Sequence, residues 1–187
     1  FIPDADILIH TGDFTNRGTE AEFKQFDDWL AVLSIKYPKM ISVVVLGNHD
    51  VYELRDNFDL ARQRLPHATH VPIFETVEVM GIAIYGSPWH WWQNWQYQDK
   101  HKPHNAQELF HLIPFGVDIL ATHGPKRGVL DEADYQKDFH SGSVNLLKEI
   151  KKKQPKMHVH GHVHEARGVN RSHTLTMNSA IADWRTT

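Results

Sequence analysis

The chain has 187 residues, of which 41% are hydrophobic and 23% charged, so it can bury the core of an ordinary domain and long disorder is excluded. Its 20 basic and 23 acidic residues give a net charge of −3, which offers no overall attraction to nucleic acid or to an anionic membrane. The chain has no cysteine, which excludes disulfides, thiolate metal sites and cysteine nucleophiles. No apolar run approaches the roughly 18 residues of a membrane helix. We interpret residues 1–187 as a single domain, and we expect a cytoplasmic location, with which the lack of cysteine is compatible.

Predicted strands and helices alternate along the chain, as they do in α/β domains. Apolar runs predict strands at residues 6–10, 40–46, 76–85, 117–121, 157–160 and 174–177, and the third of these is one strand or a hairpin bent near Gly81. Capping signals and apolar spacing predict helices that follow Thr19 and end at Pro38, and that cover about 57–65, 105–114 and 144–153. At the first of these helices, Thr19 and Glu22 form a capping box, in which the Glu22 carboxylate can reach back to the Thr19 backbone.

Four of the predicted strands run into short polar turns that contain glycine. The turns are Gly12-Asp13, Gly47-Asn48-His49-Asp50, His123-Gly124 and Gly161-His162-Val163-His164. Ligands of open α/β sheets bind beyond the carboxyl ends of the strands, so side chains of these turns are expected to converge on one rim. Those side chains are Asp13, Asn48, His123, His162 and His164. Carboxylate, amide oxygen and imidazole nitrogen suit a divalent metal such as Mn, Fe or Zn, so the sequence predicts a metal site.

These four turns, in this order, resemble four of the five signature blocks of the calcineurin-like metallophosphoesterase superfamily. The local sequence around them is similar to that of the small metallophosphoesterase-domain phosphodiesterases, notably at residues 10–15, 86–89 and 122–125. The resemblance implies an α/β fold in which two facing mixed β-sheets are flanked by helices, an αββα sandwich. It also implies a hydrolase with a dinuclear metal centre of Mn, Fe or Zn.

The resemblance assigns a role to each residue of the turns. Asp13 would bridge two metal ions, and His164 would belong to the first ion. The second ion would be completed by Asn48, His123 and His162. His49 would be the general acid for the leaving oxygen, or would stabilise charge in the transition state, with Asp50 orienting its ring. The reaction would be attack of a metal-bound hydroxide on the phosphorus of a small phosphoester, more specifically a phosphodiester, for which a nucleotide is one candidate.

One signature block of the superfamily, an Asp-x-His at the end of the first strand, has no counterpart before Asp13. Asp4 and Asp6 are not followed by a histidine two residues later, and they lie at the start of a strand. We therefore expect this strand and its block to lie upstream of Phe1, and a further strand to follow Thr187. With the chain as it stands, the first metal ion would keep only Asp13 and His164.

Other residues receive weaker predictions. Arg17 is a candidate for phosphate contact. Trp89 and His90 are candidates for the substrate pocket. They belong to an aromatic segment that can also be a packed flap or an oligomer contact. His10 is expected to be packed near the site rather than to bind metal. His158 and His160 alternate with His162 along one strand and are expected to support the site from beneath.

Two other classes of function remain open from the sequence. A non-catalytic member of the superfamily would use the same rim to hold a nucleotide or a metal as a regulatory module. A histidine-rich metal-binding protein would only resemble a phosphoesterase in its loops, and its metal retention would not depend on Asn48. A protein phosphatase is disfavoured because Asn16 interrupts the Asp-Arg-Gly sequence of those enzymes. The oligomeric state is left open.

Overall fold

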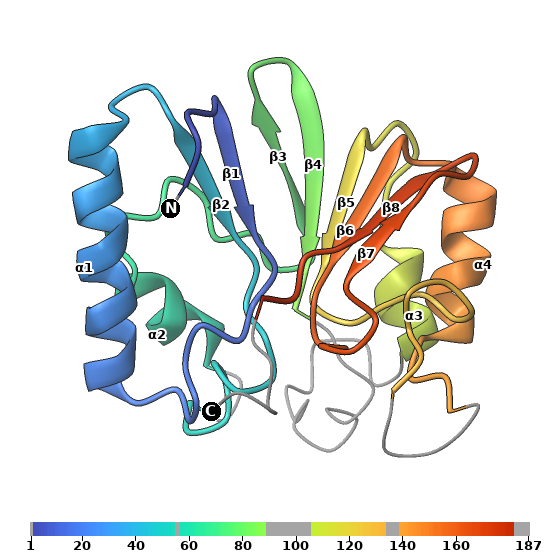
Figure 1. Ribbon diagram of the computed structural model, residues 1–187, viewed down its shortest axis with the longest axis horizontal. Coiled ribbons are helices and arrows are strands. Elements are labelled where there is room, and N and C mark those ends of the chain that lie inside the picture. Colours follow the sequence, from blue (N-terminus) through green and yellow to red (C-terminus); the bar gives the residue numbers. More distant parts are fainter. Residues whose placement is uncertain (1, 55–56, 89–105, 134–138, 182–187) are drawn as a thin grey trace.

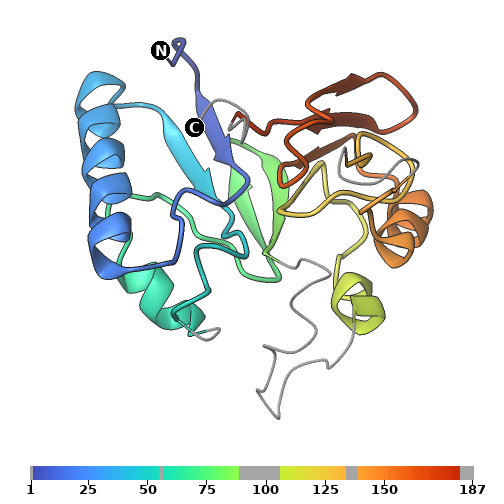
Figure 2. The same ribbon diagram turned by 60° about the horizontal axis from the view of Figure 1, so that its bottom comes forward.

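The computed structural model describes residues 2–54, 57–88, 106–133 and 139–181. Two parallel strands form a small sheet, β1 (Ile7–His10) and β2 (Ile41–Val44), and α1 (Glu20–Lys36) and α2 (Phe58–Gln63) lie beside it. A larger sheet has the strand order β3-β4-β5-β6-β8-β7. Its strands are β3 (Glu75–Val79), β4 (Ile82–Ser87), β5 (Ile119–Thr122), β6 (Met157–His160), β7 (Gly168–Asn170) and β8 (Leu175–Asn178). The helices α3 (Ala106–His111) and α4 (Val144–Lys153) cover the outer side of this sheet (Figures 1 and 2).

Three apolar layers hold the helices and sheets together. The central layer joins the two sheets through buried residues such as Val43 of β2, Ile84 of β4 and Ala121 of β5. The outer two layers bury the helices. Between the small sheet and its helices the buried core consists of Phe23, Leu30, Val44, Leu46, Val51, Leu54, Phe58, Ala61 and Leu65. Between the large sheet and its helices it consists of Tyr85, Leu109, Phe110, Ile113, Val117, Leu120, Leu146 and Ile150. The predicted αββα sandwich is thus confirmed.

The arrangement of strands confirms one alternative of the prediction and corrects two other details. Residues 75–87 form the antiparallel hairpin β3–β4, whose turn contains Gly81, as the second of the two predicted alternatives has it. Strand β7 was not predicted, because its three residues follow no apolar run and it is a strand only through pairing with β8. Within the described residues only the larger sheet is mixed, since β1 and β2 run parallel. No helix in the described part of the chain combines the length and apolar character of a membrane span.

Candidate metal centre

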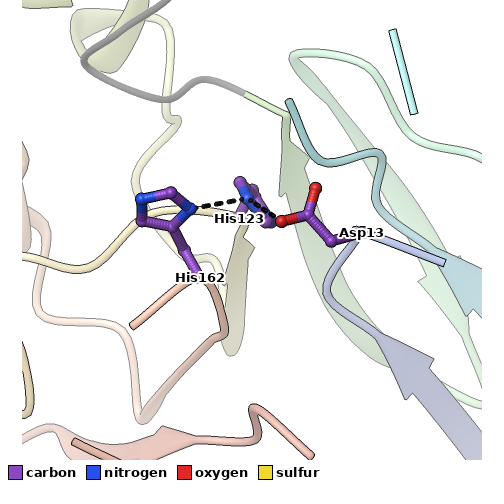
Figure 3. Close-up of side chains that lie close together, drawn as sticks. All are labelled: Asp13, His123 and His162. Atoms are coloured by element: carbon purple, nitrogen blue, oxygen red, sulfur yellow. Dashed lines mark hydrogen bonds and ion pairs between the residues drawn. The ribbon is translucent and has the colours of Figure 1, made fainter. Parts of the chain in front are cut away.

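Three side chains from separate turns converge on the Nε2 atom of His123, which lies in a fourth turn. This nitrogen lies 2.9 Å from Asn48 Oδ1, 3.2 Å from Asp13 Oδ2 and 3.2 Å from His162 Nδ1. The turns follow β1, β2, β5 and β6, so the prediction that strand ends meet at one rim describes this arrangement. Figure 3 shows the rings of His123 and His162 and the Asp13 carboxylate directed at one another. One carboxylate, one amide and two imidazoles thereby face a common point.

The His123 ring is held so that Nε2 is the nitrogen that can act as a metal ligand. The ring is fully buried, and its Nδ1 lies 2.7 Å from the Thr11 carbonyl oxygen. A carbonyl only accepts, so Nδ1 carries the hydrogen and Nε2 of the neutral ring carries a lone pair. That lone pair faces the Asp13 and Asn48 oxygens, an arrangement that is repulsive unless a cation or a proton sits among them. The donor set therefore fits a divalent metal ion.

Protonation of the free site follows the same reasoning. Burial lowers the pKa of His123, but the Asp13 carboxylate, the Thr11 carbonyl and the Asp50 charge together outweigh burial and raise that pKa above its usual value. Burial raises the pKa of Asp13, and the His123 ring and the backbone N–H of His49 more than offset this, so its pKa lies well below the usual range. A proton on His123 Nε2 thus takes the place that a metal cation would occupy.

Two of the converging residues have unusual backbone conformations. Asp13 and His162 have φ angles of 59° and 66°, in the left-handed region that residues with a Cβ seldom adopt. Such strain costs about 1–3 kcal/mol per residue and persists only where the surrounding structure enforces it. Gly47 relieves crowding at the same place, because a Cβ there would collide with the Asp13 carboxylate and the His123 ring. The backbone therefore accepts strain in order to bring these side chains together.

Asp50 holds the turns rather than the His49 ring, which corrects the role that we expected for it. Its fully buried carboxylate accepts hydrogen bonds from the backbone N–H groups of Asp13 (2.8 Å), Gly47 (2.7 Å) and Thr15 (2.9 Å), and from the Thr15 hydroxyl (2.9 Å). Burial, and then the charge of Asp13, raise its pKa to about 7, while the donors of Gly47 and Thr15 oppose the rise. Asp50 thus joins the turns after β1 and β2 into one unit.

His49 and Arg17 are exposed on the same rim. The His49 backbone N–H donates to Asp13 Oδ1 at 3.0 Å, which places the residue directly beside the converging donors. Its ring Nδ1 lies 2.7 Å from the Asn16 carbonyl, so Nδ1 carries the hydrogen and Nε2 is the nitrogen left for other partners. The carbonyl of Arg17 accepts a hydrogen bond from the backbone of Glu53, which ties this loop to the turn after His49.

A cavity of about 790 Å³ opens beside Asp13. His162 and His164 line it together with Asp13, so the structure places His164 on a wall of the same site. His10 also lines this cavity, where its ring packs edge-on against Phe14 and Phe26. Burial lowers the pKa of His10 to about 4, and its Nδ1 accepts a hydrogen bond from the backbone of Gly12. His10 is therefore a packed residue beside the site, as we expected.

The family model described as calcineurin-like phosphoesterase matches residues 1–166 of this chain. The chain belongs to this family. The metallophosphoesterase domain-containing protein 1 of Homo sapiens and that of Mus musculus are each 35% identical to it over 203 residues. These matches cover 96% of this chain and 60% of each relative, so the chain spans less than two thirds of their length.

More distant comparisons agree with this membership. The UPF0046 protein C25E10.12 of Caenorhabditis elegans is 30% identical over 204 residues, which cover 98% of this chain and 69% of that protein. The crystal structure of TT1561 of Thermus thermophilus is similar in fold, with a TM-score of 0.54 at 13% identity. That similarity covers 94% of this chain and 77% of the other. At this identity the likeness concerns the fold alone.

Trp89 and His90, which we predicted to contact substrate, lie outside the described residues. His158 and His160 of β6 are fully buried, and they pair across the sheet with Thr176 and Asn178 of β8. Because the Thr122 hydroxyl donates to the Gly124 carbonyl, His158 Nε2 must donate to that hydroxyl, at 2.8 Å. Sequence analysis placed these histidines beneath the site, and they form part of a buried polar layer on the large sheet.

His160 is expected to weaken the fold in acid. Burial lowers its pKa to about 4, whereas an unfolded histidine titrates near 6.5. Between these values the unfolded chain binds more protons, so the stabilising contribution is complete above pH 6.5 and is lost as the pH falls toward 4. From pH 8 to pH 5 the wild type should lose about 2 kcal/mol more unfolding free energy than His160→Gln in urea titrations. Equal losses in the two proteins would contradict this prediction. The pKa values of Asp50 and His123 are raised rather than lowered, and both residues are present in both proteins, so the comparison cancels their contributions.

Proposed function

We propose that this protein is a metal-dependent phosphoester hydrolase, and that it cleaves phosphodiesters with two divalent ions of Mn, Fe or Zn. One observation carries the proposal: oxygen and nitrogen donors from three other turns surround His123 Nε2, and the exposed His49 lies directly beside them. Membership of the calcineurin-like phosphoesterase family supports the coarser assignment of phosphoester chemistry. The choice of a small phosphodiester, such as a nucleotide, rests on the resemblance of residues 10–15, 86–89 and 122–125 to the small metallophosphoesterase-domain phosphodiesterases.

The second ion would be held by Asn48, His123 and His162, with Asp13 shared between the two ions. His164 would join Asp13 at the first ion, beside the cavity that both residues line. When bound, a pair of divalent ions stabilises the attacking and leaving oxygens of an in-line displacement and activates water near neutral pH. The Thr11 carbonyl keeps the His123 ring in the tautomer that such binding requires.

Departure of the leaving oxygen would then require one proton. His49 is positioned to give that proton to the leaving oxygen, because its Nδ1–H is occupied by the Asn16 carbonyl and its Nε2 faces away from that bond. An imidazole can take up and release a proton near neutral pH, which suits this task. Arg17, exposed one residue beyond Asn16, would contact the substrate phosphate, and Trp89 and His90 are proposed to contact the rest of the substrate.

The test is His49→Ala, assayed with Mn²⁺ and bis(4-nitrophenyl) phosphate. Loss of the general acid should lower kcat by about 10²-fold or more, while the metal content measured by elemental analysis stays near that of the wild type. His67→Ala is the matched control, since His67 is a partly exposed histidine that pairs with Asp27 away from the rim. Full activity of His49→Ala would overturn the role of His49. Metal and nucleotide binding by the wild type without turnover would favour a regulatory module instead.

A further inference from the structure

Within the described part of the chain, the ring of His49 is hydrogen-bonded to one backbone carbonyl, that of Asn16, and Asn16 lies on an exposed loop. The position of this carbonyl therefore depends on what holds the loop. The backbone N–H of Asn16 donates to Glu22 Oε1 at 2.9 Å, and the N–H of Arg17 donates to both Glu22 oxygens at 3.3 Å. Glu22 is in the first turn of α1, which is anchored in the core through Phe23.

The same carboxylate also completes the capping box of α1. Glu22 Oε2 accepts hydrogen bonds from the backbone N–H of Thr19 at 2.9 Å and from its hydroxyl at 2.7 Å. An ordinary capping box uses the carboxylate only for the N-cap residue. Here it reaches three residues further upstream and takes two more backbone donors. These hydrogen bonds lower the pKa of Glu22 to about 2, and those from Thr19 have the largest effect.

We propose that Glu22 is a positioning residue for His49: its carboxylate holds the Asn16–Arg17 backbone so that the Asn16 carbonyl keeps the His49 imidazole in one orientation and one tautomer. The inference rests on the role of His49 in the proposed function. The hydrogen bonds to Glu22 would thereby connect the start of α1 to the candidate site. The loop has other attachments, since Gly18 donates to the Thr15 hydroxyl and Glu53 donates to the Arg17 carbonyl, but Glu22 is the partner that reaches the Asn16 peptide.

The principal variant is Glu22→Ala, assayed with Mn²⁺ and bis(4-nitrophenyl) phosphate. We expect kcat to fall on the order of tenfold with KM changed less than about twofold, because a misplaced acid affects the chemical step more than binding. Glu20→Ala removes the same charge from the same exposed helix turn and should keep wild-type kcat. Thr19→Ala removes the N-cap side chain but leaves the bonds from Glu22 to Asn16, so it should lower stability without the fall in kcat.

A double-mutant cycle separates this inference from the proposed function. If Glu22 acts through His49, Glu22→Ala should lower kcat in the wild type and have no further effect in His49→Ala. Full activity of His49→Ala alone would reject the function assigned to His49. An impaired His49→Ala, combined with a Glu22→Ala effect that is absent or equal in both backgrounds, would reject positioning by Glu22 and leave the function standing.

A second measurement does not depend on activity. Long-range ¹H–¹⁵N spectra of the histidine rings, with the His49 signals assigned by their loss in His49→Ala, report which ring nitrogen carries the hydrogen. At pH 8 the wild type should show His49 with the hydrogen on Nδ1, whereas Glu22→Ala should show a mixture of the two tautomers. An unchanged single tautomer in Glu22→Ala would overturn the proposal.

Discussion

Replacing Asp13 with alanine is expected to abolish tight metal binding and to lower phosphodiester hydrolysis on the order of 10³-fold. Asp13 supplies the one carboxylate of the converging donors and would be shared by both ions. Without it, the remaining donors Asn48, His123 and His162 carry no negative charge to offset a divalent cation. Elemental analysis after dialysis and kcat/KM with Mn²⁺ measure the two effects in the same preparations.

Two further variants give this prediction its controls. Asp13→Asn keeps the size of the side chain but removes its charge, so it should lose metal nearly as completely as Asp13→Ala. Asp4→Ala removes an exposed carboxylate from the start of the chain and should change neither quantity. Retention of two ions by Asp13→Ala would contradict the bridging role. Metal retention by Asn48→Ala, without competition from phosphate, would point instead to a histidine-rich metal-binding protein.

Replacing Asp50 with alanine should destabilise the protein by about 2–4 kcal/mol and abolish activity. The variant leaves three backbone N–H groups, those of Asp13, Thr15 and Gly47, without their acceptor in a buried place. The loss should also free Asp13 from its left-handed backbone conformation, so the donors at His123 would no longer converge. Urea unfolding with and without Mn²⁺ measures the stability, and the benefit from Mn²⁺ should disappear in the variant.

The conservative replacement refines the test of Asp50. Asp50→Asn keeps one acceptor oxygen, so it should lose less stability than Asp50→Ala. Its amide nitrogen replaces the other oxygen and would bring an N–H donor against a backbone N–H donor. Asp59→Asn on the exposed face of α2 is the matched control and should have little effect. If Asp50→Ala unfolded at the same urea concentration as the wild type, Asp50 would not be the link between the two turns.

Local patterns were sufficient for most of the fold. The capping box of Thr19 and Glu22, the β-branched run that leads to Gly47 and the amphipathic segment at Val144 each depend on residues close in sequence. These signals predicted α1, β2 and α4 within a few residues. Strand β7 escaped prediction because its residues Gly168–Asn170 carry no apolar pattern, and pairing with a distant strand is what makes them a strand.

The candidate site was predictable as a set of residue types but not as a set of contacts. The glycine-containing turns after predicted strands singled out Asp13, Asn48, His123, His162 and His164, because donor-rich turns at strand ends are typical of sites in α/β folds. The structure places His164 on the cavity wall beside Asp13. The sequence motif also placed Asp50 next to His49, which suggested that one oriented the other. In the structure Asp50 is buried and binds backbone groups of residues 13, 15 and 47, while the partner of the His49 ring comes from residue 16.

The amino-acid sequence by itself determined the family, the strand and helix pattern and the chemical identity of the candidate metal donors, because these depend on residue types and short spacings. Only the tertiary structure decided the tautomer of His123, the hydrogen bonds by which Asp50 joins the two turns, and the hydrogen bond from the Asn16 N–H to Glu22. Each of these depends on a hydrogen bond whose geometry is set by how loops and strand ends pack, in the case of His123 across 112 residues of sequence. A hydrogen bond needs distances and angles that residue order alone does not specify, and packing supplies them.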